Sequence, residues 1–159
     1  MPTPTPPLRE RILEAFKARL ETIRIADGCF TDAGAAIFLG EAPSLSNKGD
    51  PAEAIAIAIG EDVPAETQMA NVLSDLSIEC LALVKASRDL PWRAAERVLA
   101  DLKRAIEIDL SEASLRLDGL LAEDLKRGPT RSLEREEGGT TVGLSITYRL
   151  TYLEAWGNP

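Results

Sequence analysis

Two long segments of the chain alternate between apolar and polar residues, the pattern of a β-strand with one buried face. In residues 71–85 the apolar positions begin to alternate clearly at Leu76, and leucines replace the polar residues toward the end, so that end should be covered on both sides. The second segment covers residues 141–152, where one face carries Val142, Leu144, Ile146, Tyr148, Leu150 and Tyr152. We therefore expect two long strands in one half-buried sheet.

Two other segments repeat apolar residues at helical spacing. The first covers residues 7–22, with Thr5 as its expected N-cap and Asp27–Gly28 as the turn that ends the region. The second covers residues 91–108, with Asp89 as its expected N-cap. Its apolar stripe is Ala95, Val98, Leu99, Leu102, Ala105 and Ile106. Its solvent-facing side should carry Arg93, Glu96, Arg97, Asp101, Lys103, Arg104 and Glu107.

Shorter strands are predicted from weaker patterns. Residues 35–40 are a short apolar run, and residues 54–60 place three isoleucines at every second position before a stop at Gly60. The intervening residues 42–51 are rich in turn formers and predict an exposed loop.

The C-terminal third is less regular before its last strand. Residues 109–127 fit either a short helix or an edge strand, and Gly128–Pro129 predicts a break. Residues 130–137 predict a charged strand, which Gly138–Gly139 would join to the last strand as a hairpin.

These elements predict an α+β fold, with a mostly antiparallel sheet and two main helices packed on one side. The expected order is helix, strands, helix, hairpin. Residues 1–7 are rich in proline and threonine and predict a flexible tail, and residues 8–159 predict a single domain. No apolar run is long enough for a membrane span, and cytoplasmic synthesis is expected.

Composition argues against several functions. The chain has no histidine, which removes the commonest general base and transition-metal ligand. A net charge of −8 argues against a duplex-DNA binder and fits an acidic soluble surface, or a lumen that does not retain passing DNA. Cys29 and Cys80 lack metal-site spacing and predict buried thiols.

The remaining polar clusters give no specific site. The carboxylates Glu53, Glu61, Asp62 and Glu66 flank a predicted strand but lack the spacing of a calcium loop. The basic pairs at 103–104 and 126–127 fit solvated faces or contacts with acidic residues of a neighbouring subunit. Trp92 and Trp156 lie near element ends, and Trp156 fits a core or an interface equally well. We expect no catalytic residue, cofactor or metal.

Several short sequence segments together resemble those of the tail terminator, or tail completion, proteins of long-tailed bacteriophages (minor tail protein U-like). They are residues 9–13, 19–23, 50–51, 59–62 and 138–149, in the same order relative to the long strand and the second helix. The resemblance extends over nearly the whole chain after Pro7.

The resemblance implies a non-enzymatic virion protein of the tail or neck, assembled in the host cytoplasm. It implies a hexameric ring that caps the head-proximal end of the tail tube. The partners would be further copies of the chain, the tail tube protein and the connector or neck protein, with DNA passing through the lumen. No sequence-specific nucleic-acid binding and no membrane contact are expected.

Two alternatives remain open: another phage neck, head-closure or minor capsid component, and a small ligand-binding α+β module. For a ring, we expect the subunit or tube contacts in the two most exposed loops, residues 44–50 and 135–140, and near the chain end. The candidate interface residues are Ser44, Leu45, Asn47, Lys48, Asp50, Arg135, Glu136, Glu137, Arg149 and Trp156.

Overall fold

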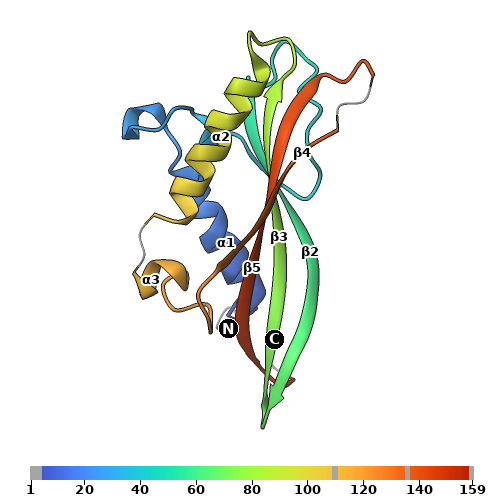
Figure 1. Ribbon diagram of the computed structural model, residues 1–159. Coiled ribbons are helices and arrows are strands. Elements are labelled where there is room, and N and C mark those ends of the chain that lie inside the picture. The colour runs from blue at the N-terminus through green and yellow to red at the C-terminus, as the bar shows by residue number, and fades with distance from the viewer. Residues whose placement is uncertain (1–4, 109–110, 135–136, 158–159) are drawn as a thin grey trace.

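The chain folds as an α+β protein with one mixed five-stranded sheet, in the order β1-β2-β3-β5-β4 (Figure 1). The computed structural model describes residues 5–108, 111–134 and 137–157. The strands are β1 (Ile37–Leu39), β2 (Glu53–Gln68), β3 (Asn71–Lys85), β4 (Lys126–Ser132) and β5 (Thr141–Ala155). The helices are α1 (Leu8–Glu21), α2 (Pro91–Ile106) and the short α3 (Glu112–Leu115), with 3₁₀ turns η1 (Ile25–Asp27) and η2 (Ala33–Ala35). Within the described residues no helix is long and apolar enough to cross a membrane.

The predicted fold class is confirmed, and the predicted order is incomplete. Helices α1 and α2 pack on one face of the sheet, as expected (Figure 1). All strand pairs are antiparallel except β1 with β2, which is parallel. The order lacked α3 and the two 3₁₀ turns. Of the predicted tail, residues 1–4 lie outside the described residues.

Three predicted strand limits were wrong. The strand expected to stop at Gly60 continues to Gln68, and its pairing with β3 shifts between Ile59 and Asp62. The predicted break at Gly128–Pro129 lies inside β4, where the pairing with β5 shifts between Arg127 and Thr130. In both places glycine marks a β-bulge, an extra residue accommodated within a strand, and not the strand end. Strand β4 also ends at Ser132, so the connection to β5 is longer than the predicted tight hairpin.

Close packing explains the choice of glycine at both bulges. A Cβ at Gly60 would lie 3.1 Å from the Ser77 carbonyl oxygen. A Cβ at Gly128 would lie 3.1 Å from the Thr147 carbonyl oxygen. Because these facing carbonyls belong to the sheet backbone, they cannot move aside easily.

The two faces of the sheet bury different amounts of apolar surface. The helix-facing side carries large side chains such as Ile55 and Ile57, which join the core under α1 and α2. The opposite side carries Ala54 and Ala56, which lie beneath Leu45 of the 42–51 loop. The Ala–Ile alternation therefore provides bulk toward the helices and lets the loop approach the other face. Leu83 belongs to the same small cluster, which confirms that this end of β3 is covered on both sides.

The predicted helix caps were wrong. The N-cap of α1 is Pro7 and that of α2 is Leu90, and neither makes a side-chain capping hydrogen bond. Leu90 is in the left-handed region at φ 47°. Proline at Pro91 fits the first turn of α2 because it has no N–H to satisfy.

Asp101 was predicted to face solvent but is only 1% exposed. Its carboxylate accepts hydrogen bonds from the Phe30 backbone N–H at 3.0 Å and from the Thr31 hydroxyl at 2.8 Å. It therefore fastens the segment after α1 to α2. The helical pattern placed Asp101 next to the apolar stripe but could not show that a distant loop would supply its donors.

Removing the Asp101 carboxylate should destabilise the fold. Asp101→Ala leaves one buried and one partly buried donor without an acceptor, and we expect it to lower the free energy of unfolding by about 2–3 kcal/mol. Asp101→Asn keeps one acceptor and should lose less. Urea unfolding followed by circular dichroism measures both values, and equal stability of the three proteins would contradict the assigned role.

A methyl group at Gly34 should also destabilise the fold. Its Cβ would lie 2.5 Å from the Leu20 carbonyl oxygen and 2.7 Å from that of Ile23, both in backbone that cannot shift cheaply. We expect Gly34→Ala to cost about 1–3 kcal/mol. Gly49→Ala is the matched control, because a Cβ there meets nothing within 4 Å. The same unfolding measurement should leave the control unchanged.

Candidate interaction surfaces

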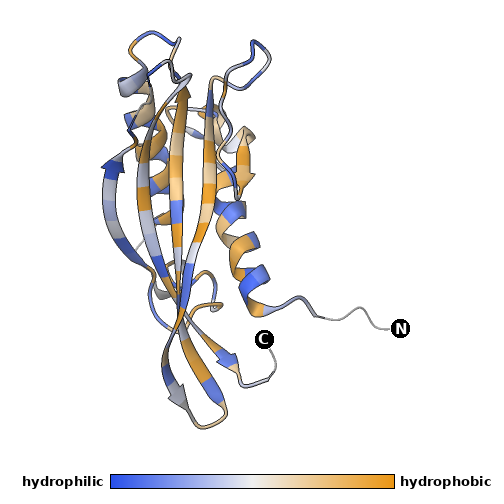
Figure 2. Cartoon of the chain, turned by 90° about the vertical axis from the view of Figure 1, so that its right-hand side faces the viewer, coloured by the Kyte–Doolittle hydropathy of each residue, from blue (hydrophilic) through white to orange (hydrophobic). Residues whose placement is uncertain are grey.

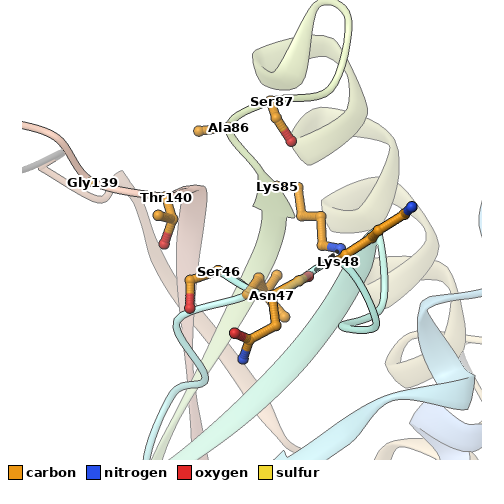
Figure 3. Close-up of a pocket in the computed structure, with 9 residues that line it drawn as sticks. Ser46, Asn47, Lys48, Lys85, Ala86, Ser87, Gly139 and Thr140 are labelled. Atoms are coloured by element: carbon orange, nitrogen blue, oxygen red, sulfur yellow. Dashed lines mark hydrogen bonds between the residues drawn. The ribbon is translucent and has the colours of Figure 1, made fainter.

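The structure brings the two predicted contact loops together at one end of the sheet. The Thr140 and Thr141 hydroxyls both donate to the Ser44 carbonyl oxygen, which joins the loop before β5 to the loop before β2. The loops border a surface hollow of about 610 Å³ with the end of β3 as its floor (Figure 3). We call this end of the molecule the loop end.

The 44–50 loop is held by bonds of its own and by one bond from the sheet. The Asn47 N–H donates to the Asp50 carboxylate at 2.7 Å, which closes a turn. The Lys85 ammonium donates to the Asn47 carbonyl oxygen at 2.9 Å (Figure 3). The loop is thus a preformed surface, with Ser44, Asn47 and Lys48 exposed.

One candidate interface residue, Leu45, is not at the surface. Leu45 is buried, because it fills the space above Ala54 and Ala56, so it anchors the loop and is unavailable to a partner. Arg135 and Glu136 lie outside the described residues, whereas Glu137 of the same loop is exposed.

The opposite end of the molecule is a three-stranded ribbon with exposed apolar side chains. Strands β2, β3 and β5 extend past the helices, and the β2–β3 turn and the end of β5 form a tip (Figures 1 and 2). Met69, in the β2–β3 turn, is 103% exposed, and Trp156 is 72% exposed. The Trp156 backbone N–H donates to the Ala70 carbonyl oxygen at 2.6 Å, so Trp156 lies beside the turn that contains Met69. Val63 and Leu153 on the ribbon are 49% and 43% exposed.

These four residues, Val63, Met69, Leu153 and Trp156, are named the apolar tip. The sequence prediction included only Trp156, and its core alternative is wrong because the indole is exposed. The sequence prediction did not include Met69, an apolar residue in the tight turn between β2 and β3. Trp92 is exposed too, at the start of α2.

The sheet face away from the helices carries segregated charge. A hollow of about 630 Å³ on this face is bordered by Glu61 and Asp75 on the β2 side and by Arg149, Lys126 and Arg127 on the β4 side. The candidate Arg149 is exposed and lies 3.9 Å from the Asp75 carboxylate. The face therefore changes from acidic to basic across the strand order.

The four carboxylates that flank the predicted strand do not form one group. Glu53 pairs with Arg88, and Asp62 pairs with Arg9 at 3.4 Å on the helix side, while Glu61 and Glu66 remain exposed. Across the described ranges, no three His, Cys, Asp or Glu side chains come close enough to hold a metal ion. Both cysteines are free thiols; Cys80 is buried, whereas Cys29 is half-buried.

Both tyrosines tie the sheet to charged groups at its margins. The Tyr148 hydroxyl donates to Glu107 at 2.9 Å, and Arg127 approaches the same carboxylate at 3.2 Å. The Tyr152 hydroxyl donates to Asp62 at 2.6 Å. Burial, and then the neighbouring carboxylates, raise the pKa of both phenols above the usual range.

A scan against protein-family models and a search of curated proteins found no match to the chain. The resemblance to tail terminators therefore stays a prediction from short sequence segments.

The two tyrosines should resist ionisation while the protein is folded. Each folded-state pKa is raised, so the stability they contribute is complete below the unfolded pKa of about 10 and is lost as pH rises through the folded pKa. Tyrosinate absorbance should therefore appear together with alkaline unfolding and not before it. Because the chain has 2 tyrosines, Tyr148→Phe and Tyr152→Phe assign the signal to each. Ionisation near pH 10 in a folded protein would contradict the described hydrogen bonds.

Proposed function

We propose that this chain is a structural protein of a long-tailed phage, a tail terminator whose copies form a ring at the head-proximal end of the tail tube. The observation that carries the proposal is the apolar tip. Met69 and Trp156 are exposed together at the end of the projecting ribbon, and Val63 and Leu153 are exposed further along its strands. Clustered exposed apolar side chains on a soluble protein mark contact with another protein.

The tip has the chemistry of an interface centre. Tryptophan and methionine are enriched at protein interfaces, where a large side chain gains much from burial. Trp156 is fixed to the β2–β3 turn through its backbone, so little freedom is lost when a partner covers it. This arrangement supports stable contact with a protein partner.

The loop end offers a second and different surface. It is mainly polar, with Ser44, Asn47 and Lys48 exposed around the hollow (Figure 3). A protein that joins two unlike assemblies needs two unlike surfaces, and these two lie at opposite ends of the sheet (Figure 1). We assign one end to the tail tube and the other to the connector, with the tip as the tube-binding end.

The net charge of −8 fits this role as well. A ring around a DNA channel benefits from like-charge repulsion that keeps the phosphate backbone from adhering to the wall. A hexamer remains the expected ring size.

The function is tested by measuring mass and capping together. Light scattering over a concentration series, alone and with tubes polymerised from the phage's own tail tube protein, should give a six-fold mass or rings only at tube ends. Electron microscopy of the mixtures should show caps at one end and arrested tube growth. A monomer that ignores tubes would overturn the proposal and favour a ligand-binding module.

Variants at the apolar tip test the assigned tube contact. Met69→Asn combined with Trp156→Gln removes two exposed apolar groups, and asparagine suits the left-handed backbone of Met69 at φ 53°. We expect capping to fall by about tenfold or more, since each buried aromatic anchor accounts for a large part of an interface. Trp92→Gln removes another exposed indole, from the start of α2, and should cap normally. Capping that is unchanged by the double substitution would move the tube contact away from the tip.

A further inference from the structure

Both edges of the five-stranded sheet are open. Strand β1 pairs only with Ile55–Ile57 of β2, so the longer remainder of β2 has no neighbour on that side among the described residues. On the other side β4 is the last strand, and all seven of its residues are exposed. Open edges are a known route by which one chain associates with another.

The two edges carry charges of opposite sign. On the β1–β2 edge are Glu41, just after β1, and Glu61 and Glu66 in β2; we call this the acidic edge. On β4 are Lys126, Arg127 and Arg131, which we call the basic edge. Strand β4 itself contains no acidic residue.

Most of these charges are available to a partner. Glu41, Glu61, Glu66 and Arg131 are exposed, and within the described parts of the chain none of them takes part in an ion pair. Lys126 pairs with Glu123 and Arg127 with Glu107, in both cases across a solvent-exposed contact. Exposed pairs of this kind contribute little and can be exchanged.

Edge protection alone does not account for this pattern. A monomeric sheet can block its edges with charge, proline and bulges, and both edges here have a proline, Pro64 and Pro129, next to a bulge. Charge protects against association between copies when the edges repel one another. Edges of opposite sign instead attract when they belong to two different copies.

We propose that the acidic edge of one copy binds the basic edge of the next, and that this head-to-tail contact forms the ring. The inference rests on the proposed function, because it supplies the lateral contact that a terminator ring requires. The contact joins two different surfaces, so it is heterologous and closes into a ring when the angle between copies allows.

The strand directions fit this arrangement. Strand β4 is antiparallel to β5, β5 to β3 and β3 to β2, so β4 and β2 of one copy point in opposite directions. Copies related by rotation about an axis roughly along the strands keep their directions. Through the pairing registers, Lys126 lies level with the Gly60–Glu61 bulge and Arg131 level with Ala56 beside β1. The β4 of one copy would therefore meet the β1–β2 edge of the next in antiparallel orientation.

The prolines and bulges determine the kind of contact. Pro64 and Pro129 cannot donate to a backbone ladder, and the bulges interrupt its spacing. Side-chain ion pairs therefore provide the specificity, and a continuous sheet through many copies is prevented. Association of this kind should weaken as salt rises, because exposed charges are screened.

The test is a charge-exchange experiment on the full chain. One variant reverses the basic edge with Lys126→Glu and Arg131→Glu. A second reverses the acidic edge with Glu61→Lys and Glu66→Lys, and a third carries all four changes. Arg127 is left unchanged because its Glu107 partner also binds Tyr148.

Self-association measured by analytical ultracentrifugation at low salt should fall by about tenfold or more in the first two variants. A one-to-one mixture of those two should associate again, and the four-fold variant should recover self-association. Arg93→Glu with Arg97→Glu makes the same change in net charge as the basic-edge variant, but on α2; it is the matched control for that variant and should associate like the parent. Circular dichroism checks that each variant is folded.

The outcomes separate this inference from the proposed function. Rings or tube caps that persist in both single-edge variants would overturn the edge contact and leave the terminator role intact. An effect of the basic-edge reversal alone, without rescue in the mixture, would point to a two-fold contact of β4 with β4 and would also overturn it. Loss and rescue as expected, in a protein that ignores tail tubes, would support the edge contact and overturn the terminator role.

Discussion

The pairing of β3 with β5 is the constraint on which the rest of the structure depends. It runs from Asn71 opposite Ala155 to Lys85 opposite Thr141 without a register shift. This pair forms the centre of the sheet, supplies the surface on which α1 and α2 pack, and extends beyond them to form the ribbon. The pairing of β2 with β3 and of β4 with β5 contains register shifts, and the central pair contains none. A long regular ladder can hold irregular neighbours because its own backbone groups are already satisfied.

The central pair could be predicted because its residues alternate over many positions, and a one-residue slip would expose every buried side chain. The limits of β2 and β4 could not. Gly60 and Gly128 look like strand ends in the sequence, because glycine at a turn and glycine at a bulge satisfy the same local requirement for space. Only the facing carbonyls of Ser77 and Thr147, which come from other strands, distinguish the two cases.

The same reasoning explains the outcome for the surface residues. Turn-forming composition identified the 44–50 loop, but not that Leu45 would be buried over two alanines of β2. The contact of this loop with Thr140 and Thr141 depends on which strands end side by side, which the sequence does not state. The charges of the two edges were visible in the sequence. Their meaning required the strand order, since residues 61–66 and 126–131 become opposite margins only when β3 and β5 lie between them.

The bulge in β2 also determines which faces of the sheet Glu61 and Asp62 occupy. Ile57 faces the helices, and in a regular strand Glu61, four residues later, would face them too. The extra residue changes the phase, so that Asp62 lies opposite Leu76 on the helix side, where it holds Tyr152 and Arg9. Glu61 therefore lies on the sheet face away from the helices. A single inserted backbone unit thus places two adjacent carboxylates on opposite faces of the sheet, Asp62 within the protein's own hydrogen-bond network and Glu61 at the surface.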